Sequence, residues 1–169
     1  MSGGLRDDGF WDEGTQEPLD PRRGRRPGVA KAAERVETRG RSRALQALYA
    51  ADLRDLSRLR RIASNVFDDL AIETGEREFA SKIVATYAER GAEIDAALAD
   101  VTANWRFERL GAIERSVLRL AACELSRDEA PVKVVLQEAV RLAERYGTSR
   151  SARFVNGVLD AYARGIGRL

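Results

Sequence analysis

The sequence predicts an all-α protein, a compact bundle of about seven helices, and three observations support this fold class. From residue 40 onward, apolar residues recur at the 3.6-residue spacing of helices, and no strand-like alternation competes with that pattern. Pro131 and Gly147 bracket one apolar stripe, as expected for the first turn of a helix and the position just after its end. No run of 18 or more apolar residues occurs, so the sequence predicts no membrane-spanning helix.

The first 37 residues are predicted to be a disordered, charged tail that precedes a helical domain over residues 38–169. This segment holds three of the four prolines and six glycines, and too few apolar residues to form a core. Its charges form blocks of opposite sign, because an acidic stretch without basic residues runs from Asp7 to Asp20 and the basic segment RRGRR follows at residues 22–26. Opposite charge blocks of this kind are typical of a solvated tail.

The predicted helices follow one another along the rest of the chain. The first carries Leu45, Leu48, Tyr49 and Leu56 on one stripe, and because Asp52 also falls on that stripe we expect the helix to fray there. The later segments are predicted over about 57–72, 79–101, 113–125, 131–146 and 150–163, with a chain break at residues 74–75 and a short connecting segment at 104–111. Gly157 lies inside the last helix, where glycine costs about 1 kcal/mol relative to alanine. We therefore expect a close contact between helices at Gly157.

The composition argues against an enzyme. The chain has no histidine and a single cysteine, Cys123, so the usual general base, serine-type triads and most zinc sites are excluded. No glycine-rich phosphate-binding loop is present. Cys123 is expected to be a small buried side chain, and the lack of a possible disulfide framework fits a cytoplasmic protein. The sequence thus predicts a binding protein without cofactor or metal.

Two stretches depart from the pattern of an ordinary helical bundle through their arginines. The chain has 26 arginines among 29 basic residues, and three of them, Arg39, Arg41 and Arg43, open the first helix in TRGRSRALQALY (38–49). Cations at a helix N-terminus oppose the helix dipole. Arg41 also falls on the extrapolated apolar stripe, so either the helix begins after it or the first turn projects beyond the bundle. Both readings place the arginines at an exposed end.

The second stretch is RYGTSRSARFVNGVLD at residues 145–160. Arg145, Arg150 and Arg153 surround a turn, and Tyr146 and Phe154 lie nearby. Basic residues interleaved with aromatic ones suit single-stranded RNA, since arginines hold phosphates and rings stack on bases. On periodicity alone, Tyr146 and Phe154 belong to the apolar stripes of their helices, which favours a place in the core.

A carboxylate at residue 124 is a further departure from the expected pattern. Glu124 shares a helix face with Ile113, Val117 and Leu120. A charge on such a face requires a partner. We expect that partner to be an arginine or a helix end.

Taken together, four segments resemble the NusB family of bacterial transcription antitermination factors. They are RGRSRALQALY (39–49), WRFERLGAIERSVLRLAACEL (105–125), APVKVVLQEAVRLAERYG (130–147) and FVNGVLD (154–160). The resemblance implies an all-α fold of two packed helical sub-bundles. It also implies binding of single-stranded boxA RNA from ribosomal RNA leader transcripts, together with the small-subunit ribosomal protein NusE, in an antitermination complex with RNA polymerase.

The resemblance assigns roles to individual positions. Arg39 and Arg41 match the arginine-rich RNA-binding motif of the family, with Arg43 as an added cation. The second RNA-contacting region is matched by Tyr146, Gly147, Arg153 and Phe154, while Arg150 stands where some relatives carry an acidic residue. Glu108 and Glu114 lie in the region that resembles the surface facing NusE.

Three other functions remain open from the sequence. One is an RNA-binding domain related to that of ribosomal RNA cytosine methyltransferases, although no cofactor-binding domain accompanies it here. Another is a helix-turn-helix DNA-binding protein built on residues 131–163, which the apolar last helix disfavours. The third is a scaffold that binds only protein, in which case neutralising Arg39 and Arg41 leaves function unchanged.

Overall fold

The computed structural model describes residues 34–169, and in this range it consists of helices and connecting turns, without strands. The elements are α1 (Val36–Asp52), η1 (Leu56–Arg58), α2 (Leu59–Asp69), α3 (Thr74–Val101), η2 (Phe107–Arg109), α4 (Ala112–Arg127), α5 (Val132–Tyr146) and α6 (Ser151–Gly165). The predicted all-α class is confirmed, and the expected number of about seven helices is close to the six α-helices and two short 3-10 helices of the described part. The prediction for residues 1–33 lies outside the described residues, and Val36 and Glu37, assigned to the tail, are the first residues of α1.

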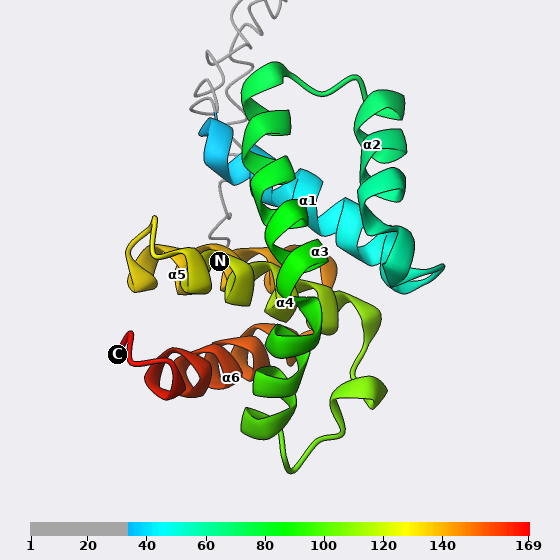
Figure 1. Cartoon of the computed structure of the whole chain (residues 1–169). Helices are drawn as coiled ribbons and strands as arrows, with labels where there is room; N and C mark the ends of the chain where they lie inside the picture. The colour runs from blue at the N-terminus through cyan, green and yellow to red at the C-terminus, as the bar shows by residue number, and fades with distance from the viewer. Residues whose placement is uncertain (1–33) are drawn as a thin grey trace, which may run out of the picture. The chain divides into compact units, whose positions relative to one another are not determined.

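The helices form two groups, and α3 of the first group packs on α4 of the second. Helices α1, α2 and α3 pack on one another, and α4, α5 and α6 form the second group. The long helix α3 contacts both α4 and α6, and α1 also contacts α4 (Figure 1). Figure 1 shows α5 and α6 lying side by side, while α2 accompanies only one half of α3. This arrangement confirms the two packed sub-bundles.

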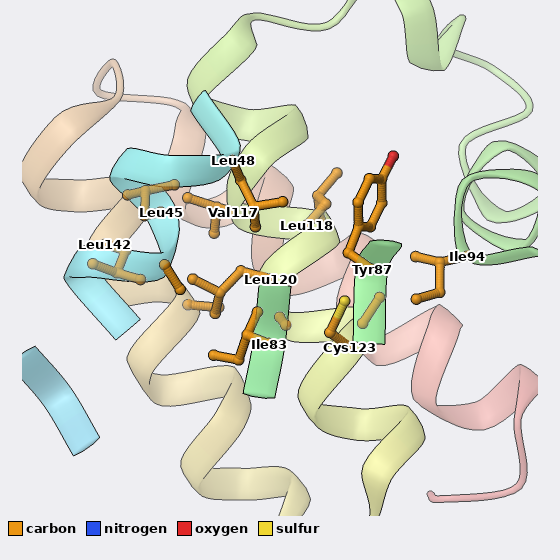
Figure 2. Close-up of a cluster of buried hydrophobic side chains, with 14 of the residues drawn as sticks. Leu45, Leu48, Ile83, Tyr87, Ile94, Val117, Leu118, Leu120, Cys123 and Leu142 are labelled. Atoms are coloured by element: carbon orange, nitrogen blue, oxygen red, sulfur yellow. The ribbon is translucent and has the colours of Figure 1, made fainter. Parts of the chain in front are cut away.

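The core is built where the apolar faces of these helices meet. Leu45 and Leu48 of α1 lie close to Val117 and Leu120 of α4 (Figure 2). Cys123 is fully buried in the same cluster, and burial raises the pKa of its thiol to about 12. The expectation that this cysteine is a buried apolar residue is thus confirmed.

The structure differs from the sequence-based prediction at two places, the start of α3 and the surroundings of Gly157 in α6. Thr74 and Gly75 do not break the chain but begin α3, and the break lies at residues 70–73, where Ala71 has a φ of 47°. Gly157 is exposed, and a Cβ atom added there would meet nothing within 4 Å. The expected close helix contact at Gly157 is wrong. In the described part of the chain, no helix is both long and apolar enough to span a bilayer.

Candidate nucleic-acid interface

The first turns of α1 hold Arg39 and Arg43 against a shared carboxylate. Glu76 of α3 is buried and accepts a hydrogen bond from Arg39 Nε at 2.7 Å and another from Arg43 Nε at 3.0 Å. Arg39 also reaches the exposed Glu73 at 3.1 Å. Burial by itself raises the pKa of Glu76, but the two guanidinium groups outweigh it and hold that pKa below its ordinary value. Both arginine side chains keep a little under a third of their surface exposed.

Arg41 lies inside the molecule. Its Nε and Nη2 donate to the two carboxylate oxygens of Glu124 on α4 at 2.8 and 2.7 Å, and its guanidinium lies over the Phe79 ring at 5.1 Å. Only 4% of Arg41 is exposed. The expectation that all three arginines gather at an exposed end is therefore wrong for Arg41, since α1 begins five residues earlier and Glu124 supplies the missing charge. The expected arginine partner of Glu124 is confirmed.

Asp52, expected to mark fraying at the end of α1, is instead buried in an ion network. It accepts hydrogen bonds from Arg115 and Arg119 of α4, and Arg119 also donates to Asp95 of α3 at 2.7 and 3.0 Å. Burial by itself raises the pKa of Asp52. The hydrogen bonds from the two arginines outweigh burial and hold that pKa below its ordinary value. The network joins α1, α3 and α4.

The turn between α5 and α6 presents most of the second predicted group. Tyr146 ends α5 and is 41% exposed, and Arg150 and Arg153 are exposed at the start of α6. Phe154 is partly buried against the core. Gly147 is required here by close approach, because a Cβ atom would lie 2.5 Å from the Ser151 hydroxyl oxygen and 2.7 Å from the Ala143 carbonyl oxygen.

A carboxylate of α4 fixes this turn. The Ser151 hydroxyl accepts a hydrogen bond from the Thr148 amide at 2.7 Å and donates to Glu114. Glu114 is therefore partly buried as an anchor of the α5–α6 turn, whereas Glu108 in η2 is exposed. Of the two predicted protein-contacting carboxylates, only Glu108 presents an open surface.

The connecting segment before α4 adds an aromatic residue that the sequence analysis did not select. The indole of Trp105 is 64% exposed and meets the Phe154 ring edge-to-face, with the ring centroids 6.2 Å apart and the planes at 76°. The two residues are far apart in sequence. They meet because the fold brings α6 beside the α3–α4 connection, which the sequence pattern does not predict.

The family model for the NusB family matches residues 38–164. The chain belongs to the NusB family. Among curated relatives, the transcription antitermination protein NusB of Anaeromyxobacter dehalogenans is 41% identical over 138 residues, covering 76% of this chain and 91% of the relative. NusB of Sorangium cellulosum is also 41% identical, over 131 residues that cover 77% of this chain and 93% of the relative.

Solved NusB structures share the fold. A structure of T. maritima NusB superposes with a TM-score of 0.70 at 32% identity, covering 76% of this chain and 90% of the other. A crystal structure of antitermination factors NusB and NusE in complex with dsRNA gives a TM-score of 0.70 at 29% identity, with coverage of 77% and 97%. The NusB family resemblance and the NusB fold expected from the sequence are confirmed.

Proposed function

We propose that this chain is a transcription antitermination factor that binds boxA-type single-stranded RNA together with NusE and supports RNA polymerase processivity. The observation that carries the proposal is the NusB fold, shared over 97% of the NusB-like chain in a crystal structure that also holds NusE and dsRNA. The exposed arginines and aromatic rings of the α5–α6 turn support it. The proposed activity of the protein is binding and not catalysis. We place the protein in the cytoplasm with the transcribing polymerase.

The proposed RNA contacts divide into direct and supporting residues. Arg150 and Arg153 lie open to solvent and hold phosphates, while Tyr146 and Phe154 offer ring surface to unstacked bases. Arg39 and Arg43 contribute the exposed parts of their guanidinium groups. Arg41 acts indirectly, because its buried ion pair fixes the first turns of α1 on α4.

The same proposal covers the remaining predicted partners. Glu108 offers an exposed carboxylate to NusE, and Glu114 shapes the neighbouring turn through Ser151. Residues 1–33 are proposed to act as a charged tail, and the segment RRGRR at 22–26 adds cations that supplement the arginine-rich start of α1. Arginine clusters of this kind strengthen RNA binding in a salt-dependent manner.

The test is a titration of boxA-type RNA with the full chain, with and without NusE, at low and at moderate salt. The parent protein is compared with Arg150→Gln/Arg153→Gln and with Arg61→Gln, which removes an exposed cation from α2. Loss of two phosphate contacts is expected to reduce the salt slope by about 1.4, at about 0.7 per contact for single strands. The control is expected to match the parent.

The outcomes separate the proposed function from its alternatives. Tighter RNA binding with NusE and a shallower slope in the double variant support the antitermination role. Binding of NusE without any RNA binding would instead identify a protein-only scaffold. The variant Arg41→Ala is unsuitable here, because removing a buried ion-pair partner also destabilises the fold.

A further inference from the structure

The arginines of the described residues divide sharply into paired and unpaired groups. Between residues 34 and 169, most arginines form a salt bridge within the described part, including all three at the start of α1. Those for which no salt bridge is found among the described residues are Arg35, Arg54, Arg61, Arg106, Arg109, Arg145, Arg150 and Arg153. Five of these eight fall in just two short segments, 105–109 and 145–153.

These two segments meet through an aromatic pair. Trp105 opens the first segment and touches Phe154, which directly follows the second. An edge-to-face pair leaves most of the indole open, in agreement with its 64% exposure. An exposed tryptophan is unusual on a monomeric surface, because its large apolar area is most often buried in a core or an interface.

The α3–α4 connection is held in a defined conformation that keeps Trp105 outward. The Trp105 amide donates to the Thr102 carbonyl at 2.6 Å, and Arg115 Nη1 donates to the Leu110 carbonyl at 2.7 Å. Phe107 is buried under the Arg119 guanidinium, which lies 5.3 Å from its ring centroid. The exposure of Trp105 is thus built into the fold, and the ring is pre-organised for a ligand.

We propose that the segment 105–109 is a second RNA-contacting element, in which Trp105 stacks on an unpaired base while Arg106 and Arg109 hold neighbouring phosphates. The inference rests on the proposed function and extends the RNA path from the α5–α6 turn across Phe154 onto the α3–α4 connection. Unpaired cations beside an open ring favour a nucleic-acid strand over a protein surface, since each arginine gains a phosphate partner and the ring gains a base.

A fluorescence titration tests the stacking directly. The chain has two tryptophans, so Trp11→Phe leaves Trp105 as the sole indole in an otherwise intact full-length protein. Stacking on a base is expected to quench the Trp105 emission as boxA-type RNA is added without NusE. Unchanged emission under conditions where binding is measured independently overturns the inference.

Variants measure how much the segment contributes. Trp105→Ala is expected to raise the Kd for RNA about 5- to 150-fold, since stacking of one base is worth about 1–3 kcal/mol. Trp105→Phe retains a ring and should recover much of the affinity, and Arg106→Gln/Arg109→Gln should reduce the salt slope. Arg61→Gln is the matched control, and urea unfolding verifies that each variant keeps its fold.

Each result distinguishes the inference from the proposed function. If Arg150→Gln/Arg153→Gln weakens RNA binding but Trp105→Ala does not, the RNA path ends at the α5–α6 turn and only the inference fails. If Trp105→Ala weakens capture of NusE and leaves the titration with RNA alone unchanged, the ring is a protein contact and the inference is overturned. If the parent protein binds no RNA, the proposed function fails and the inference fails with it.

Discussion

Arg41 and Glu124 show how two charged residues can enter a helical core. Each falls on the apolar face of its own helix, and Arg41 donates two hydrogen bonds to the two carboxylate oxygens of Glu124 in a bidentate pair. The sequence pattern predicts that Glu124 requires a partner, but the two residues are 83 positions apart in the chain. Only the packing of α1 on α4 identifies the pair.

Removing one member of this pair is expected to be costly. Arg41→Ala leaves the Glu124 carboxylate buried without a counter-charge, which typically destabilises a protein by about 3–5 kcal/mol. Replacing both, as in Arg41→Met/Glu124→Leu, should cost much less, because neither charge is then left unpaired. Urea unfolding followed by circular dichroism gives the three free energies. Losses that simply add in the double variant would contradict a direct coupling of the two side chains.

At the scale of helices, the sequence locates most elements but not the reasons for their ends. The apolar stripes predict α3 to α6 closely, because their periodicity is unbroken over several turns. The sequence pattern predicts the start of α3 too late, because Thr74 and Gly75 are typical of a chain break but form the first turn of this helix. The start of α1 is likewise missed, because its first turns carry arginines where an apolar stripe is expected. Carboxylates of α3 and α4 neutralise these arginines.

Two glycines inside helices are expected to respond oppositely to alanine. In α1, a Cβ atom at Gly40 would lie 2.8 Å from Phe79 Cδ1 and 2.9 Å from Phe79 Cβ, so Gly40→Ala should destabilise the packing of α1 on α3 by about 1–3 kcal/mol. In α6, Gly157 has open space around it, so Gly157→Ala should stabilise the protein by about 0.5–1 kcal/mol. Thermal unfolding of both variants measures the difference. A stabilising shift in Gly40→Ala would show that Phe79 does not constrain Gly40, and a destabilising shift in Gly157→Ala would contradict the open space around Gly157.

For the molecule as a whole, buried carboxylates predict the direction of acid sensitivity. The pKa of Glu76 and that of Asp52 are both lowered in the folded state by arginines. Between the ordinary pKa values and the lower folded ones, the unfolded chain therefore binds more protons than the folded chain. The free energy of unfolding thus falls as pH drops below about 4.5 toward the folded pKa values.

The variant Glu76→Gln isolates one contribution to this pH dependence. It should be less stable than the parent at neutral pH, because Arg39 and Arg43 lose their shared counter-charge. The difference should shrink as pH falls through the folded pKa of Glu76. Urea midpoints measured across this range check the expectation, and Glu78→Gln removes an exposed carboxylate from the same helix as a control. A constant gap at every pH would exclude this role for Glu76.

Much of the candidate site could be predicted from sequence, but its division of labour could not. Interleaved arginines and aromatic residues indicate the α5–α6 turn as a binding site, because these charged and aromatic side chains lie close together in the sequence. Which arginines remain free depends on carboxylates from distant helices, such as Glu76 and Glu124. The sequence does not indicate Trp105 as a site residue for the same reason, since its neighbour Phe154 belongs to a distant helix.

The shared carboxylate at the start of α1 has a kinetic consequence. With Arg39 and Arg43 facing Glu76 and Glu73, that end of the helix projects little net positive field into solution. The unpaired arginines of the two segments that meet at Phe154 project more, and long-range attraction of a polyanion depends on such uncompensated charge. If RNA follows the proposed path, a strand is expected to be captured first at the α5–α6 turn, and α1 then engages by exchanging a carboxylate for a phosphate.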